Sequence, residues 1–107
     1  MEPIAKDTMF GCQPGGERFE IQVEVGSPYQ YDDRGEEWAC PISLFPLYRR
    51  LADIHGGSSL QALCLALTLA KTLLDDFIEK GGQLTYDTGE SFDLNAVFGT
   101  QALNRQG

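Results

Sequence analysis

The sequence predicts an α/β (α+β) two-layer sandwich, built from an antiparallel three-stranded meander, one long helix and a further strand (β-β-β-α-β). Three stretches support this fold class. In residues 18–25 apolar side chains alternate with polar ones, and in residues 38–44 mostly large apolar side chains alternate with smaller ones. Residues 59–80 repeat apolar side chains at helical spacing. The 107 residues fit a single domain, 1–107, in which about 100–107 form a frayed tail.

The first two strands form a hairpin. The second strand has one apolar face, made of Phe19, Ile21, Val23 and Val25, and its other face is polar. The first strand is less regular, and the residues that share its inward parity are Ile4, Thr8, Phe10 and Cys12. A Pro-Gly-Gly turn at 14–16 joins the two strands.

The third strand contains the segment "EEWACPISL", residues 36–44. The residues that share its inward parity are Trp38, Cys40, Ile42 and Leu44. Pro41 has no N–H to donate to a neighbouring strand, so this strand lies at a sheet edge or contains a bulge. We expect the indole and the thiol to contribute packing and no reactivity.

The long helix covers residues 59–80. It follows a segment in which the spacing of Leu47 and Leu51 predicts one or two helical turns. Ser58 and Gln61 have the spacing of a capping box at its start. The glycines at 81–82 favour a left-handed cap at its end.

The helix has more apolar surface than one sheet requires. Its polar stripe consists of Gln61, Thr68, Thr72, Asp75 and Glu79. The face predicted to cover the sheet consists of Leu63, Leu67, Ala70, Leu74 and Phe77. A further row beside that face, Leu65, Leu69 and Leu73, is a candidate interface because exposed apolar surface commonly marks an interaction site.

After the helix, Leu84 and Tyr86 predict a fourth strand, followed by a tight turn at 87–89 and one helical turn at 94–98. Because one helix joins the third strand to the fourth, we expect these two strands to run parallel through a right-handed crossover.

Charge restricts the partners. Sixteen acidic residues against eight basic ones give a net charge of −8, which excludes direct binding of nucleic acid and anionic lipid. A basic protein partner would suit this charge. The first residues show neither a basic start nor an apolar run, and no apolar run anywhere is long enough to span a membrane, so we expect no signal peptide and a cytoplasmic protein.

The residues that carry chemistry are sparse, and we expect no catalytic residue, no metal and no cofactor. Cys12, Cys40 and Cys64 form no CxxC pair, and His55 is the single histidine. The triplet at 87–89, Asp-Thr-Gly, also occurs in homodimeric aspartic proteases, but the long helix favours a simple turn here.

An acidic loop provides a second candidate contact patch. Its carboxylates flank Arg34 and lie close to two tyrosines in the chain; the residues are Tyr29, Tyr31, Asp32, Asp33, Glu36 and Glu37. Such a run is usually only a solvated loop, and the two aromatic side chains make a contact patch the alternative interpretation.

The chain resembles a family of small bacterial proteins described only as a domain of unknown function. The resemblance spans nearly the whole chain: a Trp-x-Cys-Pro strand, an Ile-His-Gly segment before the helix, a Ser-x-Gln-Ala helix start and a Gly-Gly-x-Leu strand. The matching residues are Trp38, Cys40, Pro41, Ile54, His55, Gly56, Ser59, Gln61, Ala62, Gly81, Gly82 and Leu84. It implies a bacterial source and a single compact domain, and it implies no activity.

Two hypotheses about function follow. The first is a non-catalytic protein–protein interaction module that associates with itself through the leucine row or with another protein, for example as an immunity-type or antitoxin-like binder of a basic partner. The alternative is a small-ligand-binding protein or enzyme with a pocket near Trp38, Cys40 and His55.

Overall fold

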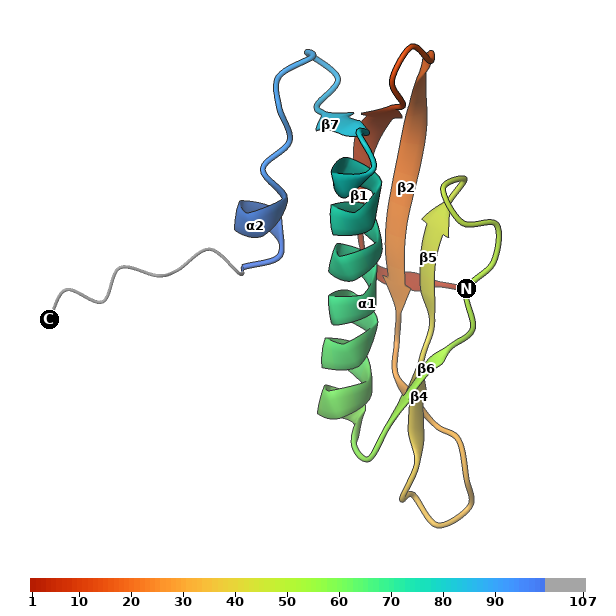
Figure 1. The fold of residues 1–107 in the computed structure, drawn as a ribbon. Coiled ribbons are helices and arrows are strands. Elements are labelled where there is room, and N and C mark those ends of the chain that lie inside the picture. Colours follow the sequence, from red (N-terminus) through yellow and green to blue (C-terminus); the bar gives the residue numbers. More distant parts are fainter. Residues whose placement is uncertain (100–107) are drawn as a thin grey trace, which may run out of the picture.

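The computed structural model describes residues 1–99, so the tail predicted at 100–107 lies outside the described residues. Its elements in chain order are β1 (Pro3–Cys12), β2 (Arg18–Gly26), β3 (Tyr29–Gln30), β4 (Trp38–Cys40), β5 (Ile42–Phe45), β6 (Ile54–Gly56), α1 (Ser59–Glu79), β7 (Gln83–Thr85) and α2 (Leu94–Val97). Figure 1 shows α1 lying along the strands, with the long β1–β2 hairpin behind it.

The predicted fold class is confirmed. Residues 1–99 form a four-stranded sheet in the order β5-β2-β1-β7 and a three-stranded sheet in the order β3-β4-β6. β1, β2 and β5 are the predicted antiparallel meander. α1 packs on β5 and β2 of the larger sheet and on β4 and β6 of the smaller one (Figure 1).

Pro41 marks the point where the third predicted strand passes from one sheet to the other. β4 precedes it in the smaller sheet, and β5 follows it at an edge of the larger sheet. The carbonyl of Pro41 accepts a hydrogen bond from the N–H of Gly26 at 2.9 Å. Because proline offers no donor, the regular pairing ends here and the chain can change sheets.

The prediction of a parallel fourth strand is wrong. β7 pairs antiparallel with β1, and β1 runs in the same direction as β5 because both are antiparallel to β2. β7 therefore runs opposite to β5. The cause is β6, which pairs antiparallel with β4 and reverses the chain once more before α1 begins.

The helical turns predicted from Leu47 and Leu51 are also absent, since residues 46–53 contain no helix in the described structure. Tyr48 instead forms an isolated antiparallel bridge with Leu44. Both leucines still pack against the core. The spacing of these two leucines therefore indicates correctly that they are partly buried, but it does not indicate a helix.

The inward parity of β1 is the opposite of the predicted one. Met9 is fully buried and lies opposite Ile21 of β2, so these two side chains share the face that α1 covers. Phe10 faces the other way, where the guanidinium of Arg18 lies 4.3 Å from its ring centroid. Ile4 is exposed.

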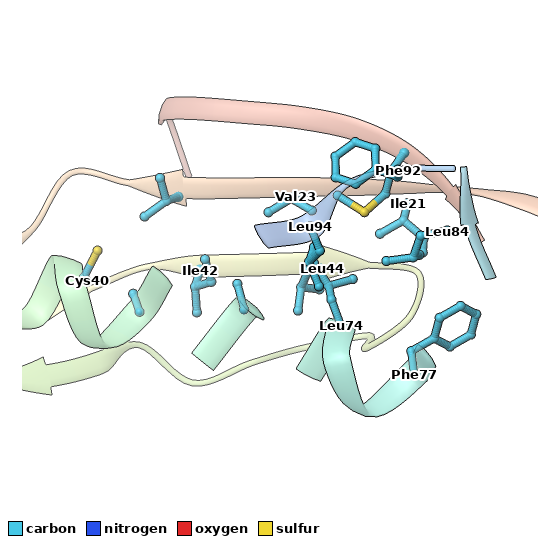
Figure 2. Close-up of a cluster of buried hydrophobic side chains, with 14 of the residues drawn as sticks. Ile21, Val23, Cys40, Ile42, Leu44, Leu74, Phe77, Leu84, Phe92 and Leu94 are labelled. Carbon is cyan, nitrogen blue, oxygen red and sulfur yellow. The ribbon is translucent and has the colours of Figure 1, made fainter. Parts of the chain in front are cut away.

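The core lies between α1 and the two sheets (Figure 2). The predicted inward residues of β2 and β5 are buried except Phe19, which is partly buried against the core, and Phe92 and Leu94 complete the buried cluster. The helix contributes Ala62, Ala66, Ala70, Leu74 and Phe77. The last three of these confirm the predicted face, whereas Leu63 and Leu67 are only partly buried. Small alanines at the start of α1 allow a close approach to the smaller sheet.

The Ser58 half of the predicted capping box is confirmed at the start of α1, whereas the Gln61 side chain reaches the residue before the cap. The Ser58 hydroxyl accepts a hydrogen bond from the N–H of Gln61 at 3.0 Å, and the Gln61 side chain accepts one from the N–H of Gly57. At the other end Gly81 takes a φ of 98°, which favours glycine.

Replacing Ser58 by alanine should therefore lower the free energy of unfolding by about 1 kcal/mol, because the first turn loses its side-chain acceptor. Urea denaturation followed by circular dichroism measures this change. Ser59→Ala is the matched control, since Ser59 is the first residue inside the helix and does not cap it. Equal losses in the two variants would contradict the capping role.

Candidate functional site

The pairing of β4 with its neighbours sends its side chains to two different faces of the smaller sheet. Cys40 lies opposite Ile54, and Trp38 lies opposite Gly56; these residues face α1. Ala39 lies opposite His55 on the outer face. The predicted inward parity of Trp38 and Cys40 is thus confirmed.

Cys40 is fully buried, and its thiol donates a weak hydrogen bond to the Gly26 carbonyl at 3.4 Å. Burial, with a smaller effect of the Asp53 charge, raises the pKa of the Cys40 thiol. Because the thiolate is the reactive form, this environment suppresses reactivity at neutral pH.

A variant in which Cys12→Ser and Cys64→Ser leave Cys40 as the single thiol should react with a disulfide reagent only as fast as the protein unfolds. The reaction should become immediate in denaturant. Stopped-flow absorbance follows both rates. The wild-type protein supplies the comparison, because Cys64 is exposed. Fast labelling of Cys40 in the native variant would contradict the burial argument.

Trp38, Cys40 and His55 do not line one pocket. His55 lies in β6 and its side chain points away from α1, whereas the side chains of the other two point toward α1. The smaller sheet separates the imidazole from the thiol. The pocket expected from these three residues is therefore not formed.

We call the face of the smaller sheet that points away from α1 the outer face. Five side chains gather there: Tyr29, Tyr31, Glu37, Asp53 and His55. The register explains the grouping. Tyr29 and His55 both lie opposite Ala39, and the other members are two residues away along their own segments.

Direct contacts hold the outer face together. Nδ1 of His55 lies 2.5 Å from Oε2 of Glu37, and the His55 ring meets the Tyr31 ring edge-on with centroids 4.5 Å apart. The Tyr29 hydroxyl donates to Oδ2 of Asp53 at 2.6 Å. This hydrogen bond raises the pKa of Tyr29.

The acidic loop between β3 and β4 is ordered by its own hydrogen bonds. Oδ1 of Asp32 accepts from the backbone N–H groups of Glu36 and Glu37 at 3.0 and 3.2 Å. Beside the loop lies a shallow depression of about 410 Å³, lined by Asp32, Arg34, Glu36, Glu37, His55, Gly56 and Gly57. Three carboxylates, a guanidinium and an imidazole thus surround an open hollow.

Part of the outer face is predictable from the sequence. The two tyrosines lie beside the acidic loop in the chain, but nothing in that segment places Asp53 and His55 with them. The signal was present, since Asp53 and His55 are two residues apart, as residues on one side of a strand are.

The candidate leucine row exposes less apolar surface than the sequence indicates. Leu65 is 42% exposed, whereas Leu69 and Leu73 are partly buried against the core. Because Ala62 and Ala66 are buried, the first half of α1 faces the sheets with a different side than predicted. That side lies nearer the leucine row, so part of the row is covered.

The remaining motifs have structural explanations. Residues 87–89 form the predicted tight turn, in which Gly89 has a φ of 92° and the N–H of Tyr86 donates to the Glu90 carbonyl. Within residues 1–99, no three histidine, cysteine or acidic side chains cluster closely enough to hold a metal ion. No helix in that range combines the length and the hydropathy needed to cross a membrane.

Comparisons of the chain with protein-family models, with curated proteins and with solved structures find no match of any of the three kinds. The resemblance to the small bacterial family stays a prediction.

The side chains of the outer face are of types that can bind a partner. Ionised carboxylates accept hydrogen bonds, and tyrosine rings offer large contact areas at a small cost in conformational entropy. The Cys40 thiol is on the other side of the sheet, so it cannot act as a nucleophile beside His55.

Proposed function

We propose that the chain is a non-catalytic protein–protein interaction module that binds a positively charged partner protein through the outer face. One observation carries this proposal. α1 covers one face of the smaller sheet, while the other face presents two tyrosines and two carboxylates to solvent. Tyr31 is 59% exposed and Tyr29 is 41% exposed.

Charge supports a basic partner. Segments 27–40 and 53–57, which build the outer face and its loop, contain five carboxylates and one arginine. The whole chain carries a net charge of −8. A surface with this excess of negative charge attracts cationic partners at long range and repels anionic ones.

Shape supports a protein over a small molecule. Small-molecule sites are usually concave and enclose most of their ligand, whereas the hollow beside the outer face is shallow and open. Tyrosines are enriched at protein interfaces because they combine an apolar ring with a polar tip. An immunity-type or antitoxin-like inhibitor of a basic protein is one form of this function, and a regulatory or accessory binder is another.

Two double variants with the same net charge test the proposal. The outer-face variant is Glu37→Gln with Asp53→Asn, and the turn variant is Asp87→Asn with Glu90→Gln. Proteins retained from a lysate of the source cell by the immobilised wild-type chain are identified and purified. Their dissociation constants for all three chains are then measured by isothermal titration calorimetry.

We expect a purified partner with net positive charge whose affinity falls roughly tenfold or more with the outer-face variant. The turn variant should bind it as the wild type does. Equal losses in both variants would show that net charge alone drives binding and would overturn the assignment to the outer face. The absence of any basic partner would overturn the proposal as a whole.

Self-association through the leucine row is a second version of the module, favoured by the exposure of Leu65 and of Leu60 on α1. A stable dimer needs roughly 800 Å² from each partner, and two chains of like charge repel each other. This version predicts that the mass in sedimentation velocity rises with protein concentration and that Leu65→Ser abolishes the rise. A single-chain mass at every concentration would exclude it.

A further inference from the structure

We infer that the outer face selects arginine over lysine in its partner, with the guanidinium against the Tyr31 ring and hydrogen-bonded to Glu37. This inference rests on the proposed function and specifies the group that is recognised. It follows from the free acceptors of the two carboxylates, from the exposed tyrosine ring and from the geometry of the two cationic side chains.

The two carboxylates each have an oxygen to spare. Glu37 meets His55 through Oε2, and Asp53 accepts from Tyr29 through Oδ2. Among the residues that the structure describes, neither carboxylate pairs with a lysine or an arginine; the nearby Arg34 lies 3.9 Å from Glu36 instead. Oε1 of Glu37 and Oδ1 of Asp53 therefore remain as acceptors for a cation from outside the chain.

Two aromatic rings, those of Tyr31 and His55, lie beside these acceptors. The Tyr31 and His55 rings are held at 74° to each other, and Tyr31 keeps more than half of its surface in solvent. Ala39 shares the outer face and is fully buried, so the larger side chains around it close over it. The outer face thus has the small Ala39 at its centre and the exposed Tyr31 ring beside it, and a planar guanidinium can stack on that ring.

Arginine suits this arrangement better than lysine. Its guanidinium is planar, stacks on aromatic rings and presents a fork of N–H donors to carboxylates. The lysine ammonium is a compact, strongly hydrated charge that gains less from a ring at an exposed site. Coulomb attraction alone would treat the two side chains alike, so a preference for arginine reports the ring and the hydrogen bonds.

Fluorescein-labelled hexa-arginine and hexa-lysine peptides have equal charge and provide the probes. Fluorescence anisotropy at physiological salt measures their dissociation constants for the wild-type chain and for Tyr31→Leu, Tyr31→Phe and Tyr86→Leu. Tyr86 is the matched control, because it is 40% exposed and lies beside Asp87 and close to Glu90, on the separate turn after β7.

We expect the wild-type chain to bind hexa-arginine roughly tenfold more tightly than hexa-lysine. Tyr31→Leu should remove this preference and leave hexa-lysine binding almost unchanged. Tyr31→Phe and Tyr86→Leu should keep it. Equal affinities for the two peptides in the wild-type chain, or a preference that survives Tyr31→Leu, would overturn the inference.

The outer-face variant separates this inference from the proposed function. If Glu37→Gln with Asp53→Asn weakens both peptides while Tyr31→Leu changes neither, arginine selection fails and the acidic binding surface stands. If neither peptide binds the wild-type chain more tightly than the outer-face variant, both the inference and the assigned surface fail.

Discussion

Replacing Leu74 by alanine should lower the free energy of unfolding by about 2–5 kcal/mol. Leu74 is fully buried on the face of α1 that packs against the sheets (Figure 2). The substitution removes buried apolar surface and leaves a cavity, because the close-packed surroundings relax only in part. Urea denaturation should show a lower midpoint with an unchanged slope.

Leu60→Ala is the matched control on the same helix. Leu60 is 68% exposed, so its replacement should change stability by less than about 0.5 kcal/mol. A loss below about 1 kcal/mol for Leu74→Ala, or equal losses in the two variants, would show that α1 does not pack as described.

Gly56→Ala should destabilise the protein by about 1–3 kcal/mol through overpacking. A methyl group on Gly56 would lie 2.7 Å from the backbone nitrogen of Ala62 and 3.1 Å from its Cα. Both atoms belong to the backbone of α1, so no side-chain rotation relieves the clash. Either β6 or α1 must shift, and β6 carries His55 of the outer face.

Gly57→Ala tests the same change one residue later. There the added methyl group meets only the side-chain oxygen of Gln61, at 3.3 Å, which can move aside. Thermal denaturation and peptide anisotropy should show a lower melting temperature and weaker peptide binding for Gly56→Ala than for Gly57→Ala. Similar results for the two variants would refute the close approach of β6 to α1.

Much of the fold was predictable because local patterns specify it. The alternation in β2 and β5 reported which side chains are buried, and the capping residues marked the start of α1. The prediction failed where the pattern was short. β6 has three residues and β3 has two, which is too few for a period to be recognised.

One missed strand had large consequences. Because the sequence pattern does not reveal β6, the predicted direction of β7 is wrong. The predicted pocket near Trp38, Cys40 and His55 fails for the same reason, since β6 places His55 on the other side of the sheet from the other two. A single added reversal changes the direction of every later element, and a shift of one residue in strand parity moves a side chain to the other face.

The sequence by itself determined the fold class, the inward parity of β2, β4 and β5, the position of α1 and the excess of negative charge, since these depend on the order of apolar, polar and charged residues along the chain. Only the tertiary structure decided that Asp53 and His55 join Tyr29, Tyr31 and Glu37 on one outer face. That grouping depends on which strands pair and in what register, which local patterns along the chain do not specify.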